Sequence, residues 1–218
     1  MMLELFAHPL SSYCWKVLIP LYENDTPFTY RMLDPEHPEN GAEFARLWPI
    51  GKFPLLVDDG CPVMESSVII EYLQRHHPGP VRFLPADDAA LEVRMLDRIF
   101  DNHVMHPMQQ VVADALRPPE RRDPVGVEQA KAALRRSYAM LDGWLAGREW
   151  AAPGGFSLAD CAAAPALFYA DWVDPIPEAL ANLKAYRARL LARPSVARAV
   201  DEARPYRPYF PLGAPDRD

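Results

Sequence analysis

The chain has 218 residues, half of them apolar, and carries a net charge of −7 at neutral pH. This length provides one large domain or two small ones with enough apolar residues for a core. The negative charge argues against nucleic acid as a partner, and no apolar run approaches the roughly 20 residues of a membrane-spanning helix. The three scattered cysteines form neither a disulfide framework nor a zinc site, so we expect a cytoplasmic protein.

The first 80 residues alternate between strand and helix patterns. Residues 3–7 predict a first strand rather than a signal peptide, because a basic start and a long apolar stretch are both missing. A buried helix over 11–23 follows, with a kink or a shift expected at Pro20. The Asp-Gly pair at 59 and 60 predicts a hairpin turn. Further strands are expected at 28–33, 53–57 and 62–64, and further helices at 41–47 and 66–77.

Every element predicted after Pro85 is a helix. Loops with Pro and Gly separate helical patterns at 89–116, 127–146, 157–172, 178–193 and 196–203. The tail over 204–218 is too rich in proline for a helix. The predicted fold class is therefore α+β: a βαβ-ββα domain over 1–80, followed by an all-α domain over 87–218.

The first predicted helix begins with Ser11, Ser12, Tyr13 and Cys14. A redox protein of the thioredoxin or glutaredoxin kind carries a cysteine at each end of such a tetrad, at a helix N-terminus where thiolates are stabilised. Here the first of the two is a serine. A thiol-disulfide reductase is therefore the least favoured of the enzymes that this domain pattern allows.

Five segments in chain order resemble the cytosolic glutathione transferases over essentially the whole chain. They are SSYCWKV from Ser11, WPIGKFP from Trp48, MESSVIIEYL from Met64, FSLADCAAAPAL from Phe156, and NLKAY from Asn182 followed by ARPSV from Ala192. The serine-type zeta and theta-like bacterial groups are nearest. Trp48 stands where the family usually has Asn and Phe53 where it usually has Val, which makes a bulkier loop there.

The resemblance implies a thioredoxin-like first domain that binds glutathione as co-substrate. A cis bond before Pro54 would turn the backbone of Phe53 outward to pair with the peptide part of the ligand. Ser66, at a helix N-terminus, would bind the γ-glutamyl carboxylate, and Glu65 would pair with the amine. The glycyl carboxylate needs a base, for which the candidates are Lys52 and His37.

The thiol of glutathione needs a group that stabilises its thiolate, since free thiols have a pKa near 8.5. Ser11 is expected to donate a hydrogen bond to this sulfur, and Ser12 remains an alternative because the two serines are adjacent. Tyr13 is expected to line the pocket, and Cys14 to be buried rather than catalytic.

The electrophile is expected between the two domains, where pockets often form. Candidate lining residues are Tyr13, Phe100, His103, Val104, Met108 and Trp172, with the tail aromatics Tyr206, Tyr209 and Phe210. His103 and His106 lie three apart on a predicted helix but lack a clear third ligand, so no metal site is expected.

Three functions stay open at this stage. The favoured one is an enzyme that attaches glutathione to a small apolar electrophile, in detoxification, or uses it in isomerisation or dehalogenation. The alternatives are a non-catalytic glutathione-binding or regulatory protein and, less favoured, the reductase. The resemblance also implies a homodimer, in which the acidic first domain meets Arg94 and Arg98 of a partner.

Overall fold

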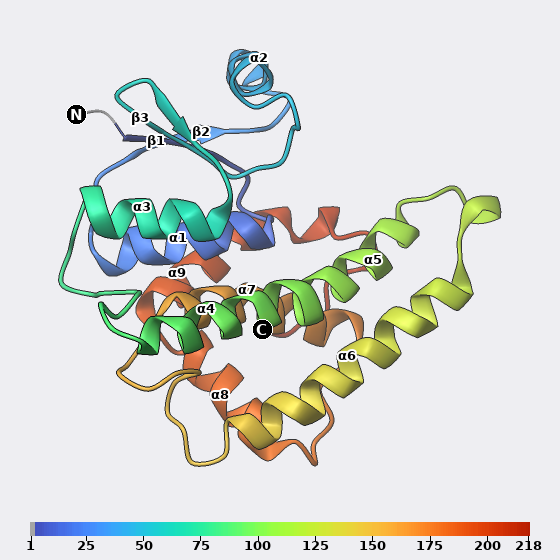
Figure 1. Cartoon of the computed structure of the whole chain (residues 1–218). Helices are drawn as coiled ribbons and strands as arrows, with labels where there is room; N and C mark the ends of the chain where they lie inside the picture. Colours follow the sequence, from blue (N-terminus) through green and yellow to red (C-terminus); the bar gives the residue numbers. More distant parts are fainter. Residues whose placement is uncertain (1–2) are drawn as a thin grey trace.

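The computed structural model describes residues 3–218, which form a small αβ domain and a larger helical domain (Figure 1). The sheet has the strand order β2-β1-β3-β4, with β2 parallel to β1 and with β3 and β4 antiparallel to their neighbours. The strands are β1 (Leu3–Ala7), β2 (Thr29–Met32), β3 (Leu55–Asp58) and β4 (Cys61–Val63). This is the predicted thioredoxin-like βαβ-ββα arrangement.

Helices cover both faces of this sheet. Helices α1 (Ser12–Glu23) and α3 (Ser66–His76) pack on one face, and α2 (Pro38–Leu47) lies on the other (Figure 1). Alternate residues of a strand point to opposite faces, so Leu5 joins the core under α1 and α3, whereas Phe6 packs under α2 against Phe44.

The second domain is all-α, as its helical periodicity predicts. Its helices enclose one large apolar core, which also takes in Trp15 and Ile19 of α1 and Ile70 of α3. The bounds are α4 (Ala89–Ile99), α5 (His106–Ala115), α6 (Pro124–Trp144), α7 (Leu158–Val173), α8 (Ala181–Leu191) and α9 (Pro194–Ala203), with short 3₁₀ turns at Pro119–Arg121 and Arg204–Tyr209.

Helix α7 occupies the centre of this domain, and all of its side chains are buried. Its first turn is fixed by Asp160, which accepts hydrogen bonds from the backbone N–H and the hydroxyl of Ser157 at 2.8 and 2.9 Å. The small residues that follow allow α1 and α4 to pack against α7. The central helix thereby joins the two domains.

Three elements differ from their predicted form. The predicted single helix over 89–116 is interrupted by a π-helical segment, Phe100–Met105, between α4 and α5. Helix α1 begins at Ser12, one residue later than predicted, and includes Pro20. Part of the proline-rich tail forms the 3₁₀ turn at Arg204–Tyr209. Over residues 3–218, no helix is both long and apolar enough to cross a membrane.

Candidate functional site

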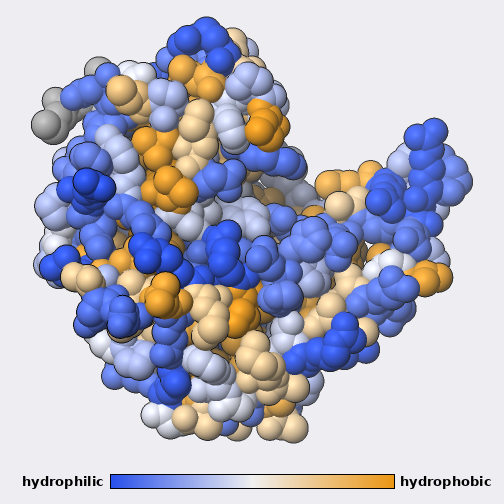
Figure 2. All heavy atoms as spheres, viewed as in Figure 1, coloured by the Kyte–Doolittle hydropathy of each residue, from blue (hydrophilic) through white to orange (hydrophobic). Residues whose placement is uncertain are grey.

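A polar cleft of about 500 Å³ lies where the two domains meet. In the view of Figure 2 the surface is hollowed between the small domain and the arm formed by α5 and α6. The small domain lines the cleft with Ser11, Tyr13, Gly51, Lys52, Phe53, Pro54, Glu65 and Ser66, and the helical domain lines it with Arg98, Asp101, Asn102 and Gln109. The eight positions of the small domain come from three separate segments: the start of α1, the loop before β3 and the start of α3.

Ser11 is the N-cap of α1 and lines the cleft. Its backbone is extended, and its Oγ accepts a hydrogen bond from the backbone N–H of Cys14 at 3.4 Å, as an N-cap serine does. The same hydroxyl hydrogen-bonds with the buried Cys14 side chain, which partly offsets the effect of burial on the pKa of that thiol. Because Ser11 also lines the cleft, a ligand there can compete for its proton. Ser12 is 6% exposed and lines only the neighbouring apolar cavity.

The 51–54 segment forms one wall of the cleft. The Phe53–Pro54 peptide bond is cis, as the sequence predicts. Phe53 is 40% exposed, and Lys52 also lies at the surface of the wall. A cation and an aromatic side chain therefore stand together at this end of the cleft.

Glu65 and Ser66 form the opposite end, where α3 begins. Ser66 is the first residue of the helix and is buried, and no side chain caps the N–H groups of the first turn. Such free N–H groups and the helix dipole favour an anion. Glu65 has φ +67°, a left-handed conformation that is costly for a residue other than glycine and that concentrates at functional sites.

The helical domain adds charges that the sequence analysis did not assign to the ligand. Arg98 and Asp101 line the cleft, and Arg98 donates hydrogen bonds to both Asp97 and Asp101 at 2.6 Å. One oxygen of the buried Asp101 carboxyl has no partner. The arginine and aspartate at a spacing of three on one predicted helix were a sequence signal, but only the packing of α4 on α3 directs them into the cleft.

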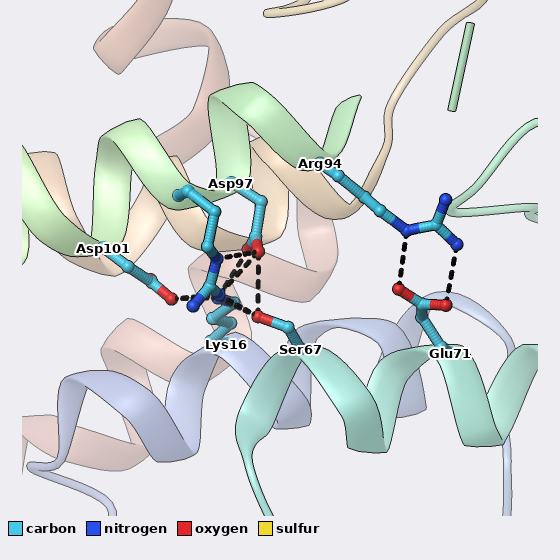
Figure 3. A network of polar contacts seen from close by, with 7 residues as sticks. Lys16, Ser67, Glu71, Arg94, Asp97 and Asp101 are labelled. Atoms are coloured by element: carbon cyan, nitrogen blue, oxygen red, sulfur yellow. Dashed lines mark hydrogen bonds and ion pairs between the residues drawn. The ribbon is translucent and has the colours of Figure 1, made fainter. Parts of the chain in front are cut away.

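A fully buried lysine joins these charges to the small domain (Figure 3). The Nζ of Lys16 contacts Asp97 at 2.5 Å, Asp101 at 2.7 Å and the hydroxyl of Ser67 at 2.9 Å. Ser67 in turn donates to Asp97 at 2.9 Å. The start of α3, which holds Ser66, is therefore fixed to the helical domain beside the cleft.

A second, apolar cavity of about 280 Å³ adjoins the cleft. Ser11, Phe53 and Gln109 line both cavities, so a ligand in one can reach the other. The remaining lining residues of the apolar cavity are His8, Leu10, Ser12, Met108, Val112, Tyr169, Phe210 and Pro211. Met108 and Phe210 were candidates from the sequence.

Several other candidates lie away from both cavities. Phe100 and Val104 are fully buried in the helical core, and Trp172 packs against Tyr169 and Phe210 behind the apolar cavity. His103 is exposed beside a different hollow. Phe100 and Val104 belong to the π-helical segment, and both side chains pack into the helical core.

His37 does not line the cleft either. It precedes α2, is largely exposed, and its ring contacts Asp34 at 2.7 Å. Lys52 is thus the candidate base that the structure places in the cleft wall.

Burial shifts the acidity of the two groups that follow the serines. It raises the pKa of Tyr13 to about 12, with the nearby Asp101 charge adding to the effect. It also raises the pKa of the fully buried Cys14 to about 12. At neutral pH Tyr13 is therefore a neutral hydroxyl and Cys14 an inert thiol. Among residues 3–218 no group of three or more His, Cys, Asp or Glu side chains could hold a metal ion.

A thioredoxin-like domain followed by an all-α domain, with a polar cleft at their junction, defines a class of two-domain proteins. Comparison with protein families identifies this class. The model described as the glutathione S-transferase N-terminal domain matches residues 5–81, and that of the glutathione S-transferase C-terminal domain matches residues 104–194. The chain belongs to the glutathione S-transferase family.

Individual relatives are distant but similar over nearly their full length. A glutathione S-transferase from Methylobacterium radiotolerans, solved in complex with glutathione sulfonate, is 27% identical with a TM-score of 0.79, over 92% of this chain and 95% of that chain. GstB, a glutathione S-transferase of Escherichia coli, is 25% identical over 91% of this chain and 98% of its own. A stringent starvation protein A homolog of Coxiella burnetii is also 25% identical, over 92% of each chain.

Proposed function

We propose that this protein joins the thiol of glutathione to a small apolar electrophile. The observation that carries the proposal is the arrangement of two connected cavities. One is polar and has an anion-binding helix N-terminus, and the other is apolar, with Ser11 lining both. A solved relative that holds glutathione sulfonate supports the same ligand.

The polar cleft matches the ends of glutathione. The γ-glutamyl carboxylate binds at the N-terminus of α3 beside Ser66, and its ammonium pairs with Glu65 and the unpartnered oxygen of Asp101. The glycyl carboxylate binds Lys52. With the ligand in this orientation, its thiol lies between the two ends, toward Ser11 and the apolar cavity.

Ser11 acts on the thiol without attacking the electrophile itself. Its hydroxyl donates a hydrogen bond to the sulfur, which favours the thiolate over the thiol, so the proton leaves to solvent. The thiolate then forms the new sulfur–carbon bond to an electrophile held in the apolar cavity. Cys14 is buried and its pKa is raised to about 12, so it does not serve as the thiol of a disulfide exchange at this site.

A second candidate is a glutathione-binding protein without transferase activity. The relative from Coxiella burnetii favours it, since the name stringent starvation protein A homolog states no enzymatic reaction. Both candidates share the cleft and differ in whether the bound thiol reacts.

The decisive experiment measures binding first and turnover second. We expect calorimetry to give a dissociation constant for glutathione between about 1 μM and 1 mM, or −8 to −4 kcal/mol. Replacing Glu65 and Ser66 together by Ala should weaken binding more than about tenfold, because charged ends of the ligand lose their partners. The control is Glu178→Ala, at a side chain that is 90% exposed, which should leave glutathione binding unchanged.

Turnover is then assayed on a panel of halides, epoxides, enones and hydroperoxides. Conjugation with at least one member supports the transferase. Binding without turnover on the whole panel supports the second candidate instead, and no binding at millimolar glutathione contradicts both.

We further propose a homodimer in which α3 and α4 face the partner. The two helices lie side by side, joined by Arg94 and Glu71 (Figure 3). Three apolar side chains on them are exposed, Val68, Leu91 and Met95. Burying such a patch against a second copy removes it from water.

The dimer proposal predicts a mass by light scattering of about twice the 24.6 kDa of one chain. Leu91→Glu should give monomers, because a carboxylate would be buried in the interface. Val125→Glu, at an exposed residue at the start of α6, should leave the dimer intact. A wild-type mass of one chain at micromolar concentration would contradict the proposal.

A further inference from the structure

His8 occupies a position that the proposed transfer of the thiol does not use. It directly follows β1 and lines the apolar cavity together with Ser11. Its ring also borders a separate hollow of about 340 Å³ beside Asp34 and Tyr206. His8 is the only ionisable side chain of the apolar cavity apart from Tyr169.

The surroundings of the ring fix its tautomer. The backbone N–H of Leu10 donates to Nδ1 of His8 at 3.1 Å, so Nδ1 is the acceptor and Nε2 carries the proton. Burial lowers the pKa of His8, with Asp34 acting against it, so the ring is neutral at pH 7. Tyr206 packs against the His8 ring in a T-shaped contact, with 4.9 Å between the two ring centroids. This contact restricts the rotation of the His8 ring.

Among residues 3–218, the Nε2–H group of His8 makes no hydrogen bond, whereas Nδ1 makes the one to Leu10. Two other polar side chains of the apolar cavity, those of Tyr169 and Ser11, already have a hydrogen-bond partner or a proposed one. The hydroxyl of Tyr169 donates to the backbone oxygen of Leu10 at 2.8 Å, Ser12 is buried, and Ser11 faces the thiol in the proposed function. The competing donors in the cavity wall are the amide of Gln109 and the hydroxyl of Ser12.

We infer that His8 is a specificity-determining residue whose Nε2–H donates a hydrogen bond to a carbonyl oxygen of the electrophile. The preferred substrates are then α,β-unsaturated carbonyl compounds with an otherwise apolar body. The inference rests on the proposed function, since it assumes that glutathione occupies the adjoining cleft. A neutral imidazole donor in an apolar wall suits an uncharged oxygen acceptor better than a halide.

The reaction balances without any further reagent. The glutathione thiolate attacks the β-carbon and forms a sulfur–carbon bond, while the π electrons of the double bond move toward the carbonyl and give an enolate. The enolate oxygen accepts the hydrogen bond from Nε2–H, and the imidazole is neutral before and after. Solvent then supplies a proton to the α-carbon, which replaces the proton that the thiol released.

A pair of matched substrates tests this role. Benzylideneacetone is an enone and benzyl chloride is a halide with the same phenyl ring. His8→Ala should lower kcat/KM for the enone about tenfold or more relative to the halide, since a hydrogen bond to a developing charge is lost. His8→Gln keeps an N–H donor, so it should restore part of the enone-to-halide ratio of kcat/KM. The control is His106→Ala, at an exposed histidine outside both cavities, which should leave that ratio as in wild type.

Two results would overturn the inference. An equal loss on both substrates in His8→Ala would mean a structural role. A loss of the enone preference in Gln109→Ala but not in His8→Ala would assign the donor to Gln109.

A binding measurement separates this inference from the proposed function. Wild type should bind S-(3-oxobutyl)glutathione about three- to tenfold more tightly than S-butylglutathione, the range for one neutral hydrogen bond, and His8→Ala should abolish the difference. Equal affinities in wild type would sink the inference while leaving the glutathione site intact. Failure to bind either conjugate, or glutathione itself, would sink the proposed function as well.

Discussion

At the scale of single residues, the hydroxyl of Ser11 both accepts a hydrogen bond and can donate one. The oxygen accepts from the N–H of Cys14 and caps α1, which orients the group. In the proposed function, its proton is donated to the sulfur of the ligand instead of to the Cys14 side chain. A serine can serve both purposes in place of the redox cysteine, because a hydroxyl is at once donor and acceptor.

Replacing this hydroxyl tests its part in the transfer. We expect Ser11→Ala to lower turnover about ten- to a hundredfold, which corresponds to ~1.5–3 kcal/mol for a hydrogen bond to a charged sulfur. The pKa of the bound thiol should rise by about 1–2 units, seen as a shift of the thiolate absorbance with pH, while glutathione affinity stays nearly constant. Ser12→Ala is the comparison; full activity in Ser11→Ala with loss in Ser12→Ala would assign the donor to Ser12.

At the scale of elements, the β3–β4 hairpin is attached to α3 through Asp58. This carboxylate ends β3 and accepts from the hydroxyl of Tyr72 at 2.9 Å and pairs with His77 at 2.6 Å. Both partners belong to α3 or its C-terminal end. The attachment joins the end of β3 to the C-terminal half of α3.

The acid sensitivity of this attachment follows from the pKa of Asp58. The hydrogen bond with His77 lowers the pKa of Asp58, with burial opposing it. A lowered carboxyl pKa stabilises the fold above the unfolded value of about 3.9, and the contribution is lost as pH falls through the folded pKa. Urea unfolding should show Asp58→Asn about 1 kcal/mol less stable than wild type at pH 6.

The difference between Asp58→Asn and wild type should shrink at about pH 3. Asp201→Asn, at an aspartate that is 68% exposed, is the control at both pH values. A difference that is the same at pH 3 and pH 6 would mean that the charge of Asp58 does not contribute.

The junction between α4 and α5 carries three of the side chains that were expected in the pocket. Spacing of four residues places Phe100, Val104 and Met108 on one face. All three pack into the helical core, and of the three only Met108 also lines the apolar cavity. The π-helical segment Phe100–Met105 separates α4 from α5 at this point.

At the scale of the whole molecule, ion pairs between the buried Lys16 and two aspartates hold the two domains together. The lysine belongs to α1, and its partners Asp97 and Asp101 belong to the helical domain (Figure 3). Charges taken out of water are tolerated only when each has a close partner. The cleft lies beside these ion pairs, so the shape of the cleft depends on how the two domains dock.

Removing the lysine should therefore destabilise the whole chain. We expect Lys16→Met to cost about 3–5 kcal/mol in the free energy of unfolding by urea, because two buried carboxylates keep only Arg98 as a cation. Lys184→Met, at a partly exposed lysine, should cost less than about 1 kcal/mol. A similarly small loss in both variants would show that the buried cluster does not hold the domains together.

The sequence by itself determined the fold class, the order of the elements and the residues of the small domain that meet in the cleft. Ser11, Lys52, Phe53, Pro54, Glu65 and Ser66 could be selected because each lies next to a local signal: a helix start, a loop with proline, or a helix N-cap. Such signals depend on neighbours in the chain, so a sequence pattern carries them.

The tertiary structure decided which further residues line the two cavities. Arg98, Asp101 and Gln109 enter the cleft, and His8 and Tyr169 the apolar cavity, whereas His37, Phe100, Val104 and His103 do not. Helical periodicity gives a face but not the element that the face meets. That choice follows from how α4 and the π-helical segment dock on α3 and α7, which depends on contacts between residues far apart in the sequence.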